Sequence, residues 1–175
     1  MTTRLPADEH HSHPAHSRET LHTMVLDLAG KDVWCREKAR HFFFRQGTAV
    51  VQYLIERLET ENPILRWEIV RILADLRETS TIPGLIASLE DTNDNIRWLA
   101  TEGLIRLGPP VVLPLLETLA ASPGSTELRE GAYQVFLTLY KHQRASRNIL
   151  TRPALKSAPP SEQTPGMVRG NPPLR

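Results

Sequence analysis

The chain has 175 residues, a net charge of +1 and a single cysteine. This length allows one domain, and a single cysteine excludes a framework of intramolecular disulfides. No apolar run reaches the roughly 18 residues of a membrane span, and the N-terminus has no apolar signal core. We therefore expect a cytoplasmic protein with no membrane contact.

The charge and the prolines divide the chain into three parts. Residues 1–17 carry a net charge of −1, residues 18–141 carry −3 and residues 142–175 carry +5. Six of the 14 prolines fall after residue 152. We expect a disordered, His-rich segment at 1–17, a folded domain at 18–141 and a basic, Pro-rich, mostly disordered segment at 142–175. Alternatively, residues 141–150 extend the last helix.

A repeat of 30 to 32 residues fills the middle part. It is marked by four arginines, each with an apolar residue directly before it and further apolar residues three and seven positions after it, on one helical face. The arginines are Arg36, Arg66, Arg97 and Arg129. Each repeat reads as two helices, and the expected pairs are 18–29 with 33–46, 48–59 with 63–77, 81–90 with 94–107, and 110–121 with 125–141.

The expected helix ends carry suitable capping residues. Asn62 followed by Pro63 is typical of a helix start, and the stretch 91–94 and Ser125 or Thr126 offer further caps. Gly47 and Gly108 are typical of helix ends.

The third copy, LIASLEDTNDNIRWLATEGLIRLG, resembles a HEAT repeat of the bacterial type first noted in phycobilin lyases. The resemblance implies an all-α, right-handed α-α superhelix, a short solenoid of about four helix pairs. The aspartate that follows the first helix in this family is present as Asp91, but Gly30, Thr60 and Ala121 stand in its place elsewhere. We therefore expect an incomplete ladder of Asp–Arg contacts between repeats, and four arginines that bond to nearby carbonyls or acids.

The resemblance also implies that the second helices line a concave face. Trp67 and Trp98 take the same position in adjacent repeats, about one helix spacing (~10 Å) apart. This favours a groove that binds a peptide or helix of a partner protein; in the alternative, each indole packs between helices. The candidate binding residues are His41, Arg45, Trp67, Arg71, Trp98, Glu102 and Arg106.

The residues give less support to nucleic-acid binding, a reactive cysteine or a metal site. The outward positions of the second helices hold three arginines and four acids, which argues against nucleic-acid binding. Cys35 occupies a core position. The four histidines between residues 10 and 16 lack a firm metal-ligand spacing, so we expect no metal and no cofactor.

Three functional alternatives follow. One family of enzymes built from HEAT repeats, the deoxyhypusine hydroxylases, binds iron through His-Glu pairs on the repeat helices, and no His-Glu dipeptide occurs in this sequence. We therefore expect a protein-interaction scaffold or adaptor that is not an enzyme. The alternatives are an accessory subunit resembling phycobilin lyases, which helps to attach a tetrapyrrole to a client protein, and a basic tail that contacts an anionic surface. Partner identity and oligomeric state stay open.

Overall fold

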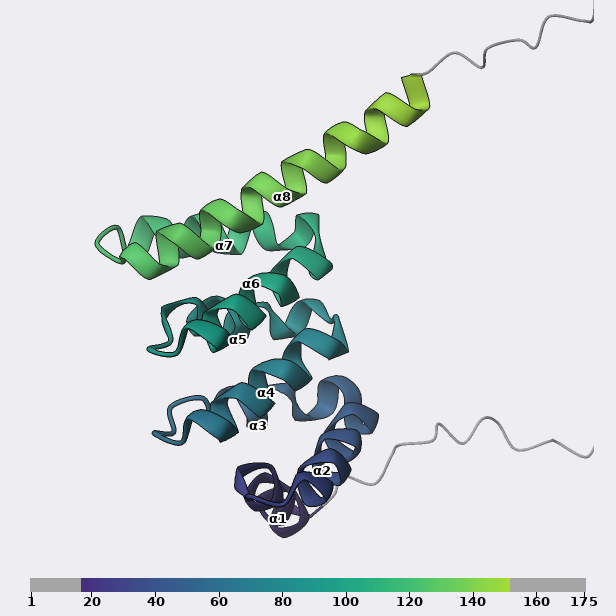
Figure 1. Cartoon of the computed structure of the whole chain (residues 1–175), viewed down its shortest axis with the longest axis vertical. Helices are drawn as coiled ribbons and strands as arrows, with labels where there is room; N and C mark the ends of the chain where they lie inside the picture. Colours follow the sequence, from purple (N-terminus) through teal and green to yellow (C-terminus); the bar gives the residue numbers. More distant parts are fainter. Residues whose placement is uncertain (1–16, 152–175) are drawn as a thin grey trace, which may run out of the picture.

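The computed structural model describes residues 17–151, and in this range every regular element is helical. Helix pairs stack along the long axis of the molecule, from α1 and α2 at one end to α7 and α8 at the other (Figure 1). The prediction of an all-α solenoid of four helix pairs is confirmed. Predictions for residues 1–16 and 152–175, including the N-terminal histidines, lie outside the described residues.

The second helix of each pair is long and begins at a capped residue. These helices are α2 (Val33–Gln46), α4 (Pro63–Leu76), α6 (Asp94–Leu107) and α8 (Thr126–Thr151). Side-chain oxygens of Asp32, Asn62, Asn93 and Ser125 accept bonds from the first backbone N–H groups, which have no partner within the helix. Gly47 and Gly108 end α2 and α6 with positive φ angles of 59° and 78°, as the sequence predicts.

The first helices of the second, third and fourth pairs are shorter than predicted. After α1 (Arg18–Ala29) come α3 (Val51–Ile55), α5 (Ile82–Ala87) and α7 (Val112–Ala121). Each of the last three begins after a 3₁₀ turn, at Gly47–Val50, Thr79–Thr81 and Pro109–Val111, and α5 also ends in one, at Ser88–Glu90. The backbone is tighter in these turns because its hydrogen bonds span three residues, as from the Val111 N–H to the Gly108 carbonyl.

The last helix is longer than predicted. The sequence places its end near residue 141, but α8 continues to Thr151, so residues 142–151 lie in the helix. Figure 1 shows this part of α8 running past the end of the stack. The side chains of residues 140–146 are all exposed, so this part of the helix packs against nothing in the described chain.

One continuous apolar core runs through the four pairs. The positions three residues after the repeated arginines, Ala39, Ile69, Ala100 and Ala132, are at most 1% exposed. Small residues let the repeats approach closely: a Cβ atom added to Gly103 of α6 would lie 2.9 Å from the Cβ atom of Ala74 on α4. Among residues 17–151 no single helix meets the length and hydropathy of a membrane span, and α6 with residues 109–121 does so only as a pair bent by 117°.

The four repeated arginines share one structural contact, which confirms the structural role expected for them. Each Nη1 atom donates to the backbone carbonyl six residues earlier, in the turn between the two helices of its own pair, at 2.7–2.9 Å. The acceptors are the carbonyls of Gly30, Thr60, Asp91 and Pro123. The arginine therefore closes each helical hairpin on itself.

The links between repeats are uneven, as the missing aspartates predict. Arg66 reaches across to Asp91 of the next repeat with two bonds, from Nε to Oδ2 at 2.7 Å and from Nη2 to Oδ1 at 3.1 Å. This hydrogen bond raises the pKa of the Arg66 guanidinium, while partial burial opposes the rise. Because the pKa is higher in the folded than in the unfolded chain, the charged guanidinium stabilises the fold fully at every pH below the ordinary pKa of arginine. This stabilisation is lost only as the pH rises through the pKa of the folded state. The Arg66 charge is therefore constant over the working pH range.

We expect Asp91→Ala to lower the free energy of unfolding by about 1.5 kcal/mol, because it removes two charge-assisted bonds between repeats. The Asp91 side chain is only 8% exposed. Asp94→Ala is the matched control: Asp94 also pairs with an arginine, Arg97, but it is 87% exposed, and we expect a cost below about 0.5 kcal/mol. Urea unfolding followed by circular dichroism measures both; equal costs would contradict this role for Asp91.

Candidate functional site

The predicted binding residues lie on three of the second helices. On α2, His41 and Arg45 are exposed. On α4, Trp67 and Arg71 are half-buried. On α6, Trp98 and Arg106 are exposed, and Glu102 is half-buried. Four of these seven side chains line three separate depressions, and the other three, Arg45, Glu102 and Arg106, lie outside them.

The two tryptophans line one depression between the starts of α4 and α6. This tryptophan groove has a volume of about 570 Å³ and is lined by Arg36, Pro63, Ile64, Trp67, Glu68, Asn93, Asn95 and Trp98. Trp98 is 64% exposed and Ile64 is 45% exposed. The groove thus presents two indoles and an aliphatic side chain to solvent, with polar side chains around them.

The two indoles differ in how they are held. Trp67 packs partly against the core, and the guanidinium of Arg71 lies 5.2 Å from the centre of its ring. Trp67 therefore partly fits the alternative in which an indole packs between helices. Trp98 does not, because most of its surface is free and it also lines a second depression against α8 with Thr101 and Tyr133.

The base of the tryptophan groove carries a buried carboxylate. Glu68 on α4 is 2% exposed. Its Oε2 atom accepts from Arg40 Nε at 3.0 Å, and its Oε1 atom lies 3.5 Å from Arg36 Nε. Both arginines belong to α2, so this cluster joins the first and second repeats where the Asp–Arg contact is missing.

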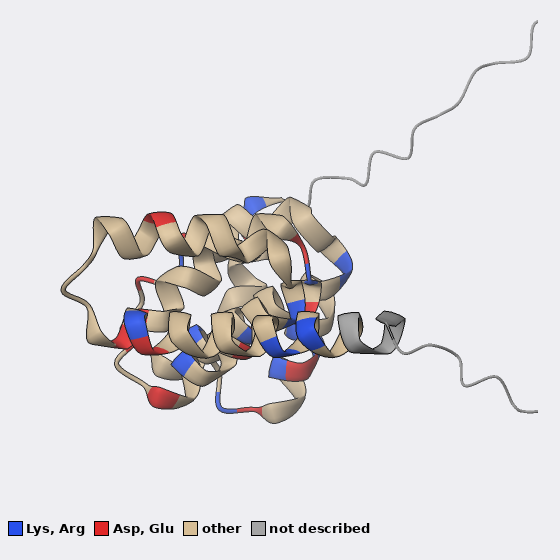
Figure 2. Ribbon diagram, turned by 90° about the horizontal axis from the view of Figure 1, so that it is seen from above, with Lys and Arg blue, Asp and Glu red and all other residues tan. Residues whose placement is uncertain are grey.

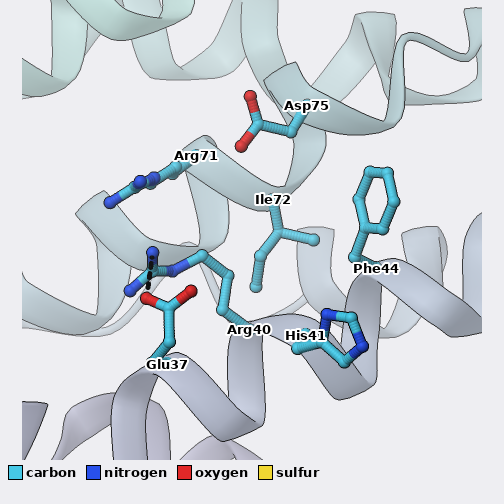
Figure 3. A pocket seen from close by; sticks show the side chains of 7 residues that line it. All are labelled: Glu37, Arg40, His41, Phe44, Arg71, Ile72 and Asp75. Carbon is cyan, nitrogen blue, oxygen red and sulfur yellow. Dashed lines mark ion pairs between the residues drawn. The ribbon is translucent and has the colours of Figure 1, made fainter. Parts of the chain in front are cut away.

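A smaller, polar pocket of about 170 Å³ lies between α2 and α4. Its lining is drawn in Figure 3: Glu37, Arg40, His41, Phe44, Arg71, Ile72 and Asp75. Arg40 binds Glu37 at 2.8 Å. The charges of opposite sign are mixed, so the pocket does not select an anion or a cation.

Sequence reasoning missed part of the tryptophan groove. Ile64, Asn93 and Asn95 line it, although they lie at helix starts rather than at the outward positions used for prediction. The capping residues Asn62 and Asn93 mark these helix starts and are a signal for them. Conversely, five predicted residues do not line the groove: His41, Arg45, Arg71, Glu102 and Arg106. Arg106 lies 3.7 Å from Asp75.

Metal-binding groups are not clustered in residues 17–151: no three His, Cys, Asp or Glu side chains there lie close enough to hold an ion. Cys35 is half-buried at the start of α2.

Comparison with known proteins gives two matches. The family model described as HEAT repeats matches residues 51–136. A stretch of 79 residues is 35% identical to deoxyhypusine hydroxylase from Danio rerio, and it covers 44% of this chain and 26% of the hydroxylase. The chain therefore matches about a quarter of the length of that curated relative.

The second match corrects one prediction from the sequence. The missing His-Glu dipeptides led to the expectation that the chain is not an enzyme. That expectation is wrong as stated, because the relative that shares these repeats is an enzyme. The absence of His-Glu dipeptides argues only against iron binding through His-Glu pairs.

Proposed function

The chain is a HEAT-repeat protein, and on this basis we propose that it binds a segment of a partner protein in the tryptophan groove. The observation that carries the proposal is the shared lining of this groove by Trp67 of one repeat and Trp98 of the next. Tryptophan is enriched among the residues that dominate binding energy in protein interfaces. Trp98 gains most from a partner, because 64% of its side chain is exposed without one.

The lining of the groove indicates the chemistry of the partner segment. Two indoles and Ile64 would take up a bulky apolar side chain, while Asn93 and Asn95 offer amide groups at the edge. The nearby arginines Arg36 and Arg40 are already bound to Glu68, so an acidic segment gains little from them. We therefore expect an uncharged segment with at least one large apolar residue.

A peptide library displayed on phage and selected on the full chain tests this proposal. We expect the selected peptides to lose at least ~30-fold in affinity when both Trp67 and Trp98 are replaced by alanine, since truncating a dominant interface residue costs 2 kcal/mol or more. Fluorescence anisotropy of the labelled peptides measures the change.

Trp34→Ala is the matched control for this experiment. Trp34 lies on α2, is 79% exposed and does not line the tryptophan groove. It should leave peptide affinity unchanged, and circular dichroism should show the same helicity in all variants. Peptides that bind the double variant as tightly as the unchanged chain would contradict the proposal.

The similarity to deoxyhypusine hydroxylase favours a second candidate, a function directed at deoxyhypusine. In this case the repeats would recognise a client that carries this residue. Mass spectrometry of a deoxyhypusine-containing protein incubated with the purified chain, dioxygen and a two-electron reductant, with and without added iron(II), tests it. A mass increase of one oxygen supports this candidate, and an unchanged mass together with no binding of that protein removes it.

A further inference from the structure

The last repeat ends the solenoid with a face that inner repeats bury. Leu137 of α8 lies eight residues after Arg129, the position that Ala74 takes after Arg66. Ala74 is 1% exposed because it packs toward Gly103 of the following repeat. On α7, Leu116 takes the position of Ile86 on α5, and their exposed fractions are 49% and 5%. No repeat follows α8 among the described residues, so no neighbouring repeat covers this face, on which Leu137 is half-buried.

The outer face of α8, defined by Glu130, Tyr133, Leu137, Tyr140, Lys141 and Arg144, points away from the core. Leu128, Ala132 and Val135 are at most 1% exposed and line the inner side of the helix. Leu137 follows Val135 by two residues, which rotates it about 200° around the helix. Tyr133 and Tyr140 are 61% and 59% exposed. Isolated apolar side chains are common on surfaces, but here they form one stripe.

Charge is arranged symmetrically about the centre of this stripe. No charged residue occurs between Glu130 and Lys141, and Figure 2 shows this central part of α8 without blue or red. Glu130 precedes Leu137 by seven residues and Arg144 follows it by seven. Seven residues are about two helical turns, so all three lie on the same side of α8.

We propose that the outer face of α8 pairs with the same face of a second copy, antiparallel, with the two Leu137 side chains at the two-fold axis. In this arrangement Glu130 of each copy meets Arg144 of the other, and Tyr133 of each meets Lys141 of the other. A face that is complementary to itself is what a two-fold interface requires. Like charges at both ends of the stripe would not give this match.

The test is a charge swap on the full chain, followed by analytical ultracentrifugation from micromolar concentration upward. The unchanged chain should form a dimer. Glu130→Arg and Arg144→Glu should each raise the dimer dissociation constant about tenfold, because each places two like-charged pairs at the interface. The double variant Glu130→Arg with Arg144→Glu should restore the original constant to within about threefold, since the pairs re-form with reversed polarity.

Two further variants keep the experiment decisive. Leu137→Asp should abolish the dimer, because two carboxylates would meet at the axis. Lys38→Glu, at an exposed site on α2, is the control and should change nothing. A chain that stays monomeric, a dimer that survives Leu137→Asp or a double variant that fails to recover overturns the proposal. Trp67→Ala should leave the dimer intact, so this result is independent of the groove.

Discussion

Replacing Glu68 by alanine is expected to lower the free energy of unfolding by about 3 kcal/mol, since it leaves the guanidinium groups of Arg36 and Arg40 without their shared carboxylate. Glu68 is 2% exposed, and the two arginine side chains are 20% and 14% exposed. Little water is therefore available to replace the lost contacts. Urea unfolding at neutral pH measures the change.

The control uses the other carboxylate that binds Arg40. Glu37 lies 2.8 Å from Arg40, but its side chain is 62% exposed, so Glu37→Ala should cost less than about 1 kcal/mol. The loss in free energy of unfolding for Glu68→Gln should lie between those of the two alanine variants, because glutamine keeps an acceptor oxygen but carries no charge. If both alanine variants cost the same, burial is not what makes the Glu68 cluster important.

The second large effect is expected at Gly103, where valine should cost about 2–3 kcal/mol. A glycine inside a helix is normally about 1 kcal/mol worse than alanine, so an added side chain would usually stabilise α6. Here the new Cβ atom would lie 2.9 Å from Ala74 Cβ and 3.3 Å from Ala74 Cα. Ala74 cannot rotate away, so α4 and α6 must separate.

Gly124→Ala is the control for Gly103→Val. Gly124 lies in the turn before α8, and a Cβ atom there would meet nothing within 4 Å. We expect its free energy of unfolding to change by less than about 0.5 kcal/mol. Thermal and urea unfolding of the unchanged chain and the two variants measures these changes in stability. A Gly103→Val variant as stable as the unchanged chain would show that the repeats tolerate a wider spacing.

The sequence predicts the fold well because its repeat is set by local chemistry. Apolar spacing, the capping residue Asn62 and the glycines Gly47 and Gly108 act within one helical hairpin, and each lies where it was expected. The sequence does not predict the 3₁₀ turns beside the first helices, because they depend on local hydrogen bonds such as that from the Val111 N–H to the Gly108 carbonyl. The sequence does not predict where α8 ends, since residues 142–146 are exposed and pack against nothing that would mark an end.

The candidate site was predicted less completely, because it depends on contacts between repeats. The shared position of Trp67 and Trp98 follows from the register, and the two do line one groove. The register cannot show that Trp67 packs against the core while Trp98 faces solvent. The register does not point to Glu68, because its equivalents in the other repeats are Lys38, Leu99 and Gly131, and only Arg36 and Arg40 of another repeat explain a carboxylate there. That the groove binds a partner stays a prediction.

The pair formed by Arg66 and Asp91 has a consequence for recognition. It fastens the second repeat to the third, the same junction that the tryptophan groove spans. Between the third and fourth repeats, Arg97 bonds only within its own hairpin and to Asp94 of its own helix. The junction where a ligand would sit therefore has a charge-assisted contact between repeats that Arg97 does not supply at the next junction. We expect this contact to hold the two sides of the groove in place before a ligand binds, so that the protein loses little conformational entropy on binding.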